Sequence, residues 1–255
     1  MLFIPFLLLT ISLSAQEAFT RPAAGMTIEF KEIYELKIVG YDGTDLKVER
    51  TGRGSDRDER ARGLRKINAR GLVDNTGQGV SVTADGDHLL ISQVGDSDGL
   101  LTVSVPNRSV VRVVQSSNRG DDLTVANFSG ELEVSMHYND VRLVNTSGPL
   151  AVNVVYGDIE ADLTATPLRN DARLHSSYGS VDVILPKAAK ADLRLSTSYG
   201  DMYTDFDVVV KASTKQDGDD CGHCSHSGGL TGQINGGGPL LALTATYDDI
   251  YLRKK

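Results

Sequence analysis

The sequence predicts an all-β protein built as a β-solenoid with about 20 residues per coil. A short phrase recurs along the chain, and apolar and polar residues alternate between its copies. No helical pattern separates these segments. Each coil of such a solenoid has an apolar face that only neighbouring coils can cover, so we expect the coils to stack.

The repeated phrase starts with a tyrosine and places a polar residue two positions later. Its copies are Tyr138-Asn139-Asp140, Tyr156-Gly157-Asp158, Tyr178-Gly179-Ser180, Tyr199-Gly200-Asp201 and Tyr247-Asp248-Asp249. The first four tyrosines are 18, 22 and 21 residues apart, and the last follows after 48. A sandwich of hairpins is the alternative, but it favours Asp-Gly turns, and those at residues 42–43 and 85–86 lie outside the repeat. The spacing therefore predicts that like corners stack on successive coils.

Short alternating segments mark the expected strands. Near the N-terminus they cover residues 27–30, 36–39 and 46–49, with a turn at residues 41–44 between the last two. Further along, apolar residues two positions apart are expected to face the core: Leu123 and Val125, Leu132 and Val134, Val141 and Leu143, Val152 and Val154, Ile159 and Ala161. The residues between them, Thr124, Glu133, Arg142, Asn153 and Glu160, are expected to face outward.

Residues 1–15 form an apolar run that ends in small residues, which indicates a signal peptide cleaved near Ala15. A membrane anchor is the alternative, but the run is shorter than the roughly 20 residues that a span needs. We expect residues 16–255 to form a single exported solenoid domain without a transmembrane span after signal removal. The formal net charge of −8 argues against nucleic acid as a partner.

Two segments interrupt the pattern. Residues 50–66 are rich in charged side chains and predict a solvated loop, with a cationic patch for an acidic glycan or lipid head group as the alternative. Residues 211–230 are expected to be a loop insertion that interrupts a coil, after which Gly238-Pro239-Leu240 restarts a turn.

The insertion contains Cys221, His223, Cys224 and His226. A disulfide between the two cysteines is the favoured interpretation in an oxidising compartment. A zinc site made by all four residues is the alternative, although structural zinc sites usually draw ligands from two separated pairs. The Cys-x-x-Cys spacing also matches disulfide isomerases, but the flanking residues do not suggest the helix N-terminus that lowers a catalytic thiol pKa.

The corners themselves contain candidate binding residues. The carboxylates of Asp140, Asp158, Asp201 and Asp249 are expected to cap their own turns through local bonds to the backbone, with calcium bound along a column as the alternative. Stacked as a ladder, the tyrosines would form a sugar-binding stripe if exposed, or complete the core if half-buried. We favour the core role for this possible ligand face, which consists of Tyr138, Tyr156, Tyr178 and Tyr199.

The passages of residues 118–163, 176–207 and 234–255 resemble a family of exported bacterial β-strand-repeat proteins of unknown function, with Bacteroidetes-type members, often labelled putative adhesin. The resemblance implies a right-handed parallel β-solenoid located in the periplasm, on the outer membrane or outside the cell. It implies no activity. Asp248 stands in the last corner, where such members usually carry glycine.

These observations predict a non-catalytic envelope or cell-surface protein that binds or supports another component, either a glycan or a protein. No catalytic residue and no cofactor is expected, since the sequence shows no nucleophile motif, phosphate loop or paired acids. A polysaccharide-acting enzyme with carboxylates gathered across coils is one alternative. A metal-binding envelope protein that uses the Cys/His loop is the other.

Overall fold

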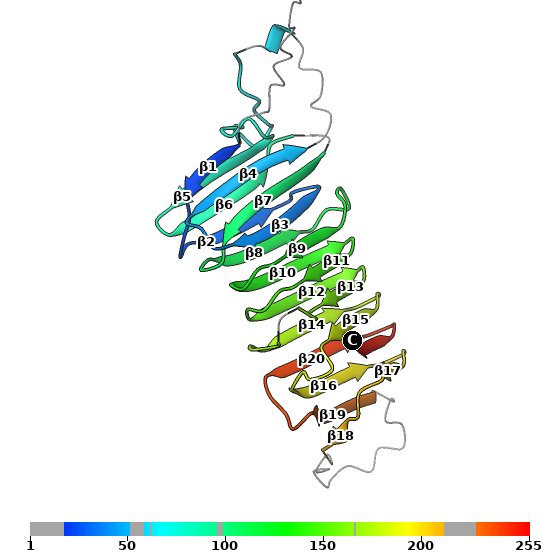
Figure 1. Ribbon diagram of the computed structural model, residues 1–255. Helices are drawn as coiled ribbons and strands as arrows, with labels where there is room; N and C mark the ends of the chain where they lie inside the picture. Colours follow the sequence, from blue (N-terminus) through cyan, green and yellow to red (C-terminus); the bar gives the residue numbers. More distant parts are fainter. Residues whose placement is uncertain (1–17, 52–58, 62, 96–98, 166, 212–227) are drawn as a thin grey trace, which may run out of the picture.

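The computed structural model describes residues 18–51, 59–61, 63–95, 99–165, 167–211 and 228–255. Within these ranges the chain forms 21 strands and one helical turn, the 3-10 element η1 (Glu59–Ala61). The strands belong to two long sheets (Figure 1). The prediction of an all-β protein is confirmed.

The first sheet has ten strands. In spatial order they are β1 (Phe19–Pro22), β4 (Asp45–Thr51), β7 (Leu100–Pro106), β3 (Leu36–Tyr41), β9 (Leu123–Ala126), β11 (Val141–Val144), β13 (Ile159–Asp162), β15 (Val181–Leu185), β21 (Ile250–Lys254) and β17 (Met202–Thr204).

The second sheet has eleven strands. In spatial order they are β18 (Val209–Val210), β19 (Gly228–Ile234), β16 (Ala191–Thr197), β20 (Leu240–Ala245), β14 (Ala172–Ser176), β12 (Leu150–Tyr156), β10 (Glu131–Tyr138), β8 (Val110–Gln115), β2 (Thr27–Lys31), β6 (His88–Gln93) and β5 (Val80–Asp85).

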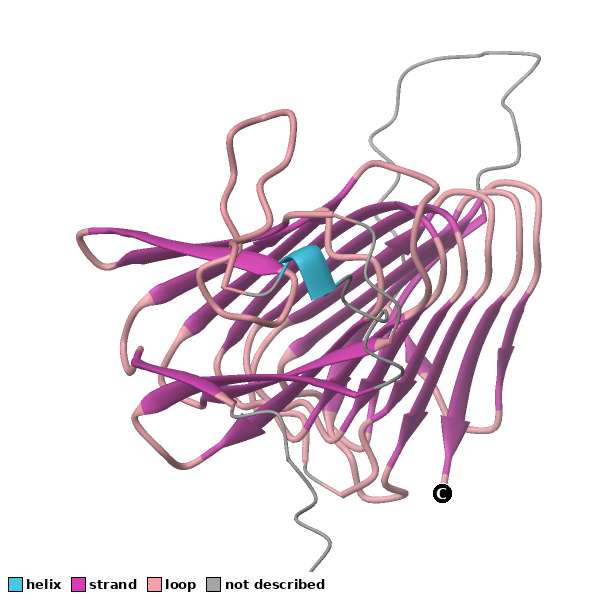
Figure 2. Ribbon diagram, turned by 90° about the horizontal axis from the view of Figure 1, so that it is seen from above, coloured by secondary structure: helices cyan, strands magenta, loops and turns pink. Residues whose placement is uncertain are grey.

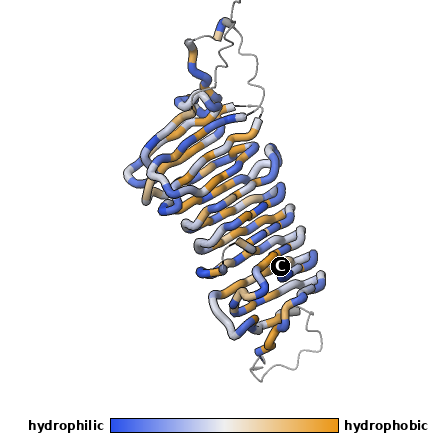
Figure 3. Tube along the Cα trace, in the orientation of Figure 1, coloured by the Kyte–Doolittle hydropathy of each residue, from blue (hydrophilic) through white to orange (hydrophobic). Residues whose placement is uncertain are grey.

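The core lies between the two sheets and consists of the inward side chains of both. All ten apolar residues that the alternation pointed inward, from Leu123 to Ala161, are buried in one cluster. The residues between them are exposed or half-buried, so the strands alternate in hydropathy along their length (Figure 3). Apolar burial at about 25 cal/mol per Å² is the main force that holds the coils together.

The middle of the molecule is solenoid-like. We call a coil one strand of the second sheet together with the strand of the first sheet that follows it. Coils β8–β9, β10–β11, β12–β13 and β14–β15 lie side by side in sequence order, and all neighbouring strands are parallel. Val141, for example, pairs with Leu123 and with Ile159. The loops that join the sheets consequently lie one behind another (Figure 2).

The first coil departs from sequence order. Coil β2–β3 lies between coil β6–β7 and coil β8–β9 in both sheets. The expected turn at residues 41–44 does connect two strands, but β3 and β4 are not neighbours, because β7 lies between them. A purely sequential stack is therefore wrong at this end.

The last coil departs from sequence order in the same way. Strand β20 pairs with β14 on one side and with β16 on the other, and β21 pairs with β15 and β17. The red strand β20 is visible between β14 and β16 in Figure 1. The coil nearest the C-terminus thus completes the stack between two earlier coils.

Antiparallel strands close both ends, which corrects the expectation of parallel pairing throughout. Strands β1, β4 and β5 pair antiparallel at one end, and β18 and β19 do so at the other. Such strands cover the edges of the parallel coils, which would otherwise be free to pair with another chain.

The two interrupting segments are only partly described. Arg50 and Thr51 belong to β4, so the charged loop starts later than expected, and residues 52–58 and 62 lie outside the described ranges. Residues 228–230 belong to β19, which trims the expected insertion. Among the described residues, no helix has the length and apolar character that a membrane span requires.

Candidate functional site

Five tyrosines from five coils stack in a single file, which we call the tyrosine column. Its spatial order is Tyr138, Tyr156, Tyr178, Tyr247 and Tyr199. Successive ring centroids are 5.5, 4.7, 4.8 and 4.9 Å apart, and the interplanar angles fall from 17° to 1° along the column. These separations match the spacing of hydrogen-bonded strands, so the stacking follows directly from the coil geometry.

Backbone bonds between coils fix the column. Tyr138 and Tyr156 are the last residues of β10 and β12 and pair in register, and the other three tyrosines follow the ends of β14, β20 and β16 by two residues. The amide of Tyr178 donates to the carbonyl of Val155 at 2.9 Å, and the amide of Tyr247 donates to Ser177 at 3.0 Å. The ring positions therefore depend on the main chain rather than on flexible side-chain contacts.

At three of the five corners glycine follows the tyrosine, at Gly157, Gly179 and Gly200, and there the backbones of neighbouring corners approach closely. A Cβ atom on Gly179 would overlap the carbonyl group of Gly157 on the adjacent coil. The Tyr-Gly pair of the repeated phrase thus places a large ring outside and leaves no side chain inside the corner.

The column is exposed, which corrects the expectation that the tyrosines complete the core. The exposed fractions are 38% for Tyr138, 51% for Tyr156, 50% for Tyr178 and Tyr247, and 74% for Tyr199. The strand alternation ends at the corner, where His137 and Tyr138 are both exposed. Tyr247 belongs to the column too, although the expected ligand face did not include it.

The corner aspartates bond to neighbouring coils rather than to their own turns. Asp140 Oδ1 accepts from the amide of Asp158 at 2.8 Å, and Asp158 Oδ1 accepts from the amide of Ser180 at 2.6 Å. Asp249 Oδ1 accepts from the amide of Asp201 at 2.8 Å. The expectation of local caps is therefore wrong for these three residues. Their carboxylates link the coils along one side of the tyrosine column.

A second, shorter stack lies beside the column on the first sheet. The rings of Tyr203 and Tyr251 are 5.3 Å apart and 11° from parallel. The Tyr251 hydroxyl donates to Asp249 Oδ2 at 2.9 Å, and the Tyr203 hydroxyl donates to Asp201 Oδ2 at 3.4 Å. The sequence signal for this pair is a second tyrosine four residues after Tyr199 and Tyr247.

The carboxylates also raise the pKa values of these phenols. The charge of Asp201 is the main cause that raises the pKa of Tyr203, and the hydrogen bond to Asp249 is the main cause that raises the pKa of Tyr251. Both hydroxyls are therefore neutral donors at physiological pH.

Two described carboxyl groups, those of Asp162 and Glu32, have a lowered pKa. Hydrogen bonds from Thr164 are the main cause of the lowered pKa of Asp162. Burial raises the pKa of Glu32, but the hydrogen bonds from Ser116 and Ser117 together outweigh this effect. The pKa of Glu32 is therefore below its ordinary value. A glycoside hydrolase needs one carboxyl whose pKa is raised, and these two groups are shifted in the opposite direction.

Cys221, His223, Cys224 and His226 lie outside the described residues, and so the disulfide and zinc interpretations stay predictions. Elsewhere, the part of the chain that the structure describes contains no group of three or more metal-ligating side chains.

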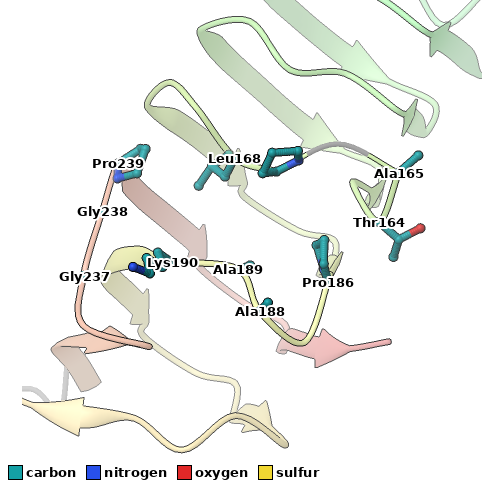
Figure 4. A pocket seen from close by; sticks show the side chains of 11 residues that line it. Thr164, Ala165, Leu168, Pro186, Ala188, Ala189, Lys190, Gly237, Gly238 and Pro239 are labelled. Carbon is teal, nitrogen blue, oxygen red and sulfur yellow. The ribbon is translucent and has the colours of Figure 1, made fainter.

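An open groove of about 450 Å³ lies among three loops, which follow β13, precede β16 and precede β20. Figure 4 shows Leu168, Pro186 and Pro239 among its lining residues, and Lys190 is the charged residue of the lining. Alanines, prolines and glycines make up most of the rest. The lining has no acid, thiol or imidazole that could carry out chemistry.

Comparison with known proteins gave one family and two solved structures. Residues 122–225 match the profile of the family described as Toastrack DUF4097. A putative cell adhesion protein from Clostridium sporogenes is 11% identical with a TM-score of 0.48, and the match covers 94% of this chain and 99% of that one. A putative adhesin from Bacteroides fragilis is 11% identical with a TM-score of 0.30, and the match covers 94% and 98%. No curated protein matches the chain.

The family match covers four of the five column tyrosines and extends through Cys221 and Cys224. It confirms the resemblance that the repeated phrase indicated. Residues 122–225 of this chain are therefore similar to the Toastrack DUF4097 family, a strand-repeat family of unknown function.

Proposed function

We propose that this protein is an exported, non-catalytic module that binds a glycan at the cell envelope through the tyrosine column. The observation that carries the proposal is the exposure of five stacked phenols on one side of the coils. Buried tyrosines would contribute only to the core, whereas exposed rings offer apolar carbon and a polar hydroxyl together.

The column suits sugar recognition for two physical reasons. Tyrosine has few rotatable bonds, so ordering it against a ligand costs little conformational entropy. The backbone already holds these rings in place, so little further ordering is needed when a ligand binds. A contiguous exposed aromatic surface also needs an explanation, because soluble proteins rarely expose one without a binding role.

The chemistry of the surrounding groups favours binding over cleavage. Asp140, Asp158 and Asp249 each use one carboxylate oxygen to accept a backbone amide of the next coil. A carboxylate held in this way is suited to a structural role and less suited to proton transfer. A polysaccharide-acting enzyme is therefore the less favoured alternative.

Two finer features belong to the same proposal. We take the coils to be right-handed with about 20 residues each, which fits register offsets of 18 residues between Val141 and Ile159 and 22 between Ile159 and Val181. Parallel crossover connections are right-handed in about 98% of known cases. The apolar run at residues 1–15 supports export.

The proposal is tested by isothermal titration calorimetry with neutral and acidic oligosaccharides, followed by chromatography of each sugar after incubation. We expect one glycan class to bind and to be recovered intact. Replacing all five column tyrosines by serine is expected to weaken binding at least tenfold, because contacts worth about 1 kcal/mol each are removed.

Tyr34→Ser serves as the control, since Tyr34 lies outside the column, and circular dichroism checks that each variant is folded. Cleaved sugar would contradict the non-catalytic role. Unchanged affinity in the fivefold variant would contradict the assignment of the site.

A further inference from the structure

We infer that the ligand is a neutral glycan and that one of its sugar rings docks face-on against Tyr199, at the end of the tyrosine column. This inference rests on the proposed function and specifies where and how the glycan binds. It follows from which ring faces in the column are open.

The inner rings of the column have no free face. Tyr156, Tyr178 and Tyr247 each have a parallel neighbour on both sides, at centroid distances of 4.7 to 5.5 Å. A sugar that stacks on an aromatic ring needs a gap of its own on that face, and the column leaves none. These tyrosines present only their ring edges and hydroxyls to a ligand.

The two end rings differ in how open they are. Tyr138 is 38% exposed and has the ring of His137 beside it at 6.5 Å. Tyr199 is 74% exposed, and among the described residues the one ring stacked on it is that of Tyr247. The most accessible aromatic face of the column is therefore the outer face of Tyr199.

Strand β19 is the neighbour of β16 on the side of this face. Strand β19 runs antiparallel to β16. It places Gly228 opposite Thr197 and Gly229 opposite Ser196. Ser196 and Thr197 lie just before Tyr199 in the chain. Glycines at these two positions add no side chain to the approach. Large side chains there would narrow access to the end of the column.

Polar groups that can hydrogen-bond to sugar hydroxyls lie beside the ring of Tyr199. Strand β17 is the last strand of the first sheet, so Tyr203 is also an end ring, and it is 50% exposed. Asp201 lies between Tyr199 and Tyr203 in the chain, and its exposed carboxylate accepts from the Tyr203 hydroxyl at 3.4 Å. The remaining lone pairs of the Asp201 carboxylate oxygens can accept hydrogen bonds from sugar hydroxyls.

The charge around the column selects a neutral sugar. Asp140, Asp158, Asp201, Asp248 and Asp249 follow the column along its length. The protein also carries a net charge of −8. Uronic acids and sulfated sugars would therefore be repelled at low ionic strength.

The test compares single variants in calorimetric titrations with the neutral hexasaccharides of cellulose, β-1,3-glucan, mannan and chitin, and with oligogalacturonate. We expect Tyr199→Ala to weaken binding of the neutral ligand at least tenfold. Tyr199→Phe should stay within about twofold of the native protein, because it keeps the ring face. Tyr156→Ala, which removes an inner ring, should stay within about threefold.

Equal losses for Tyr156→Ala and Tyr199→Ala would overturn face-on docking and indicate binding along the row of ring edges, with the proposed function intact. Tighter binding of oligogalacturonate than of any neutral sugar would overturn the neutral assignment. If the native protein binds none of these sugars, the proposed function itself fails.

Discussion

Replacing Leu243 by alanine is expected to lower the free energy of unfolding by about 2–5 kcal/mol. Leu243 is completely buried in β20 and pairs in register with Leu174 of β14 and Leu195 of β16. Because β20 lies between two strands, the residues around the resulting cavity are held by both neighbours and cannot move in to fill it. A leucine in an end strand would have more freedom to relax, and its loss would cost less.

Chemical denaturation of the native protein and Leu243→Ala measures this effect. Thr244→Ala is the matched control, since Thr244 is the next residue on the same strand and is only half-buried. We expect that control to change stability by less than about 1 kcal/mol. A loss below 1 kcal/mol for Leu243→Ala would mean that β20 is not enclosed by two neighbours.

Replacing Gly148 by alanine is expected to cost about 3 kcal/mol, although it adds only one methyl group. The added Cβ would overlap the carbonyl oxygen of Gly130 on the adjacent coil and lie 2.7 Å from the carbonyl oxygen of Ser129. Both obstacles are main-chain atoms, which cannot rotate away as the end of a side chain could. The two coils would have to separate locally and weaken the ladder between β10 and β12.

The control is Gly229→Ala in β19, where the nearest atom to an added Cβ is 3.9 Å away. Alanine is expected to be neutral or slightly stabilising there, since it restricts the unfolded chain at no steric cost. Thermal unfolding of both variants distinguishes crowding from a general effect of losing glycine. Equal midpoints for the two variants would contradict the close approach of the coils.

The strands and the stacking of like corners could be predicted from the sequence because both are local or periodic properties. The buried pairs from Leu123 to Ala161 follow from alternation alone. The parallel register between Tyr138 and Tyr156 follows from the repeated phrase. Neither required knowledge of contacts between distant segments.

The position of the last coil could not be predicted in this way. Its local pattern equals that of every other coil, and its neighbours are decided by pairing between segments far apart in the chain. The step of 48 residues between Tyr199 and Tyr247 was the one visible signal, and it fits an insertion equally well. Only the pairing of β20 with both β14 and β16 distinguishes a last coil placed between two earlier coils from an insertion in a sequential stack.

The roles of the corner residues could not be predicted from the sequence for a related reason. A turn aspartate such as Asp158 usually bonds within its own turn, and the stacking places the amide of Ser180 within reach instead. The exposure of Tyr199 depends on which coil is outermost, which the sequence order does not reveal.

The order of the tyrosine column is the claim on which the site and the ligand orientation both depend. It is tested most directly by cysteine pairs at column positions, in a chain whose Cys221 and Cys224 are replaced by serine. The account predicts efficient oxidation to a disulfide for residues 178 and 247 and for residues 247 and 199. It predicts no disulfide for residues 178 and 199, which are separated by the Tyr247 ring and so lie beyond the roughly 7 Å limit for such bonds. Ready cross-linking of residues 178 and 199, with none to residue 247, would contradict the account.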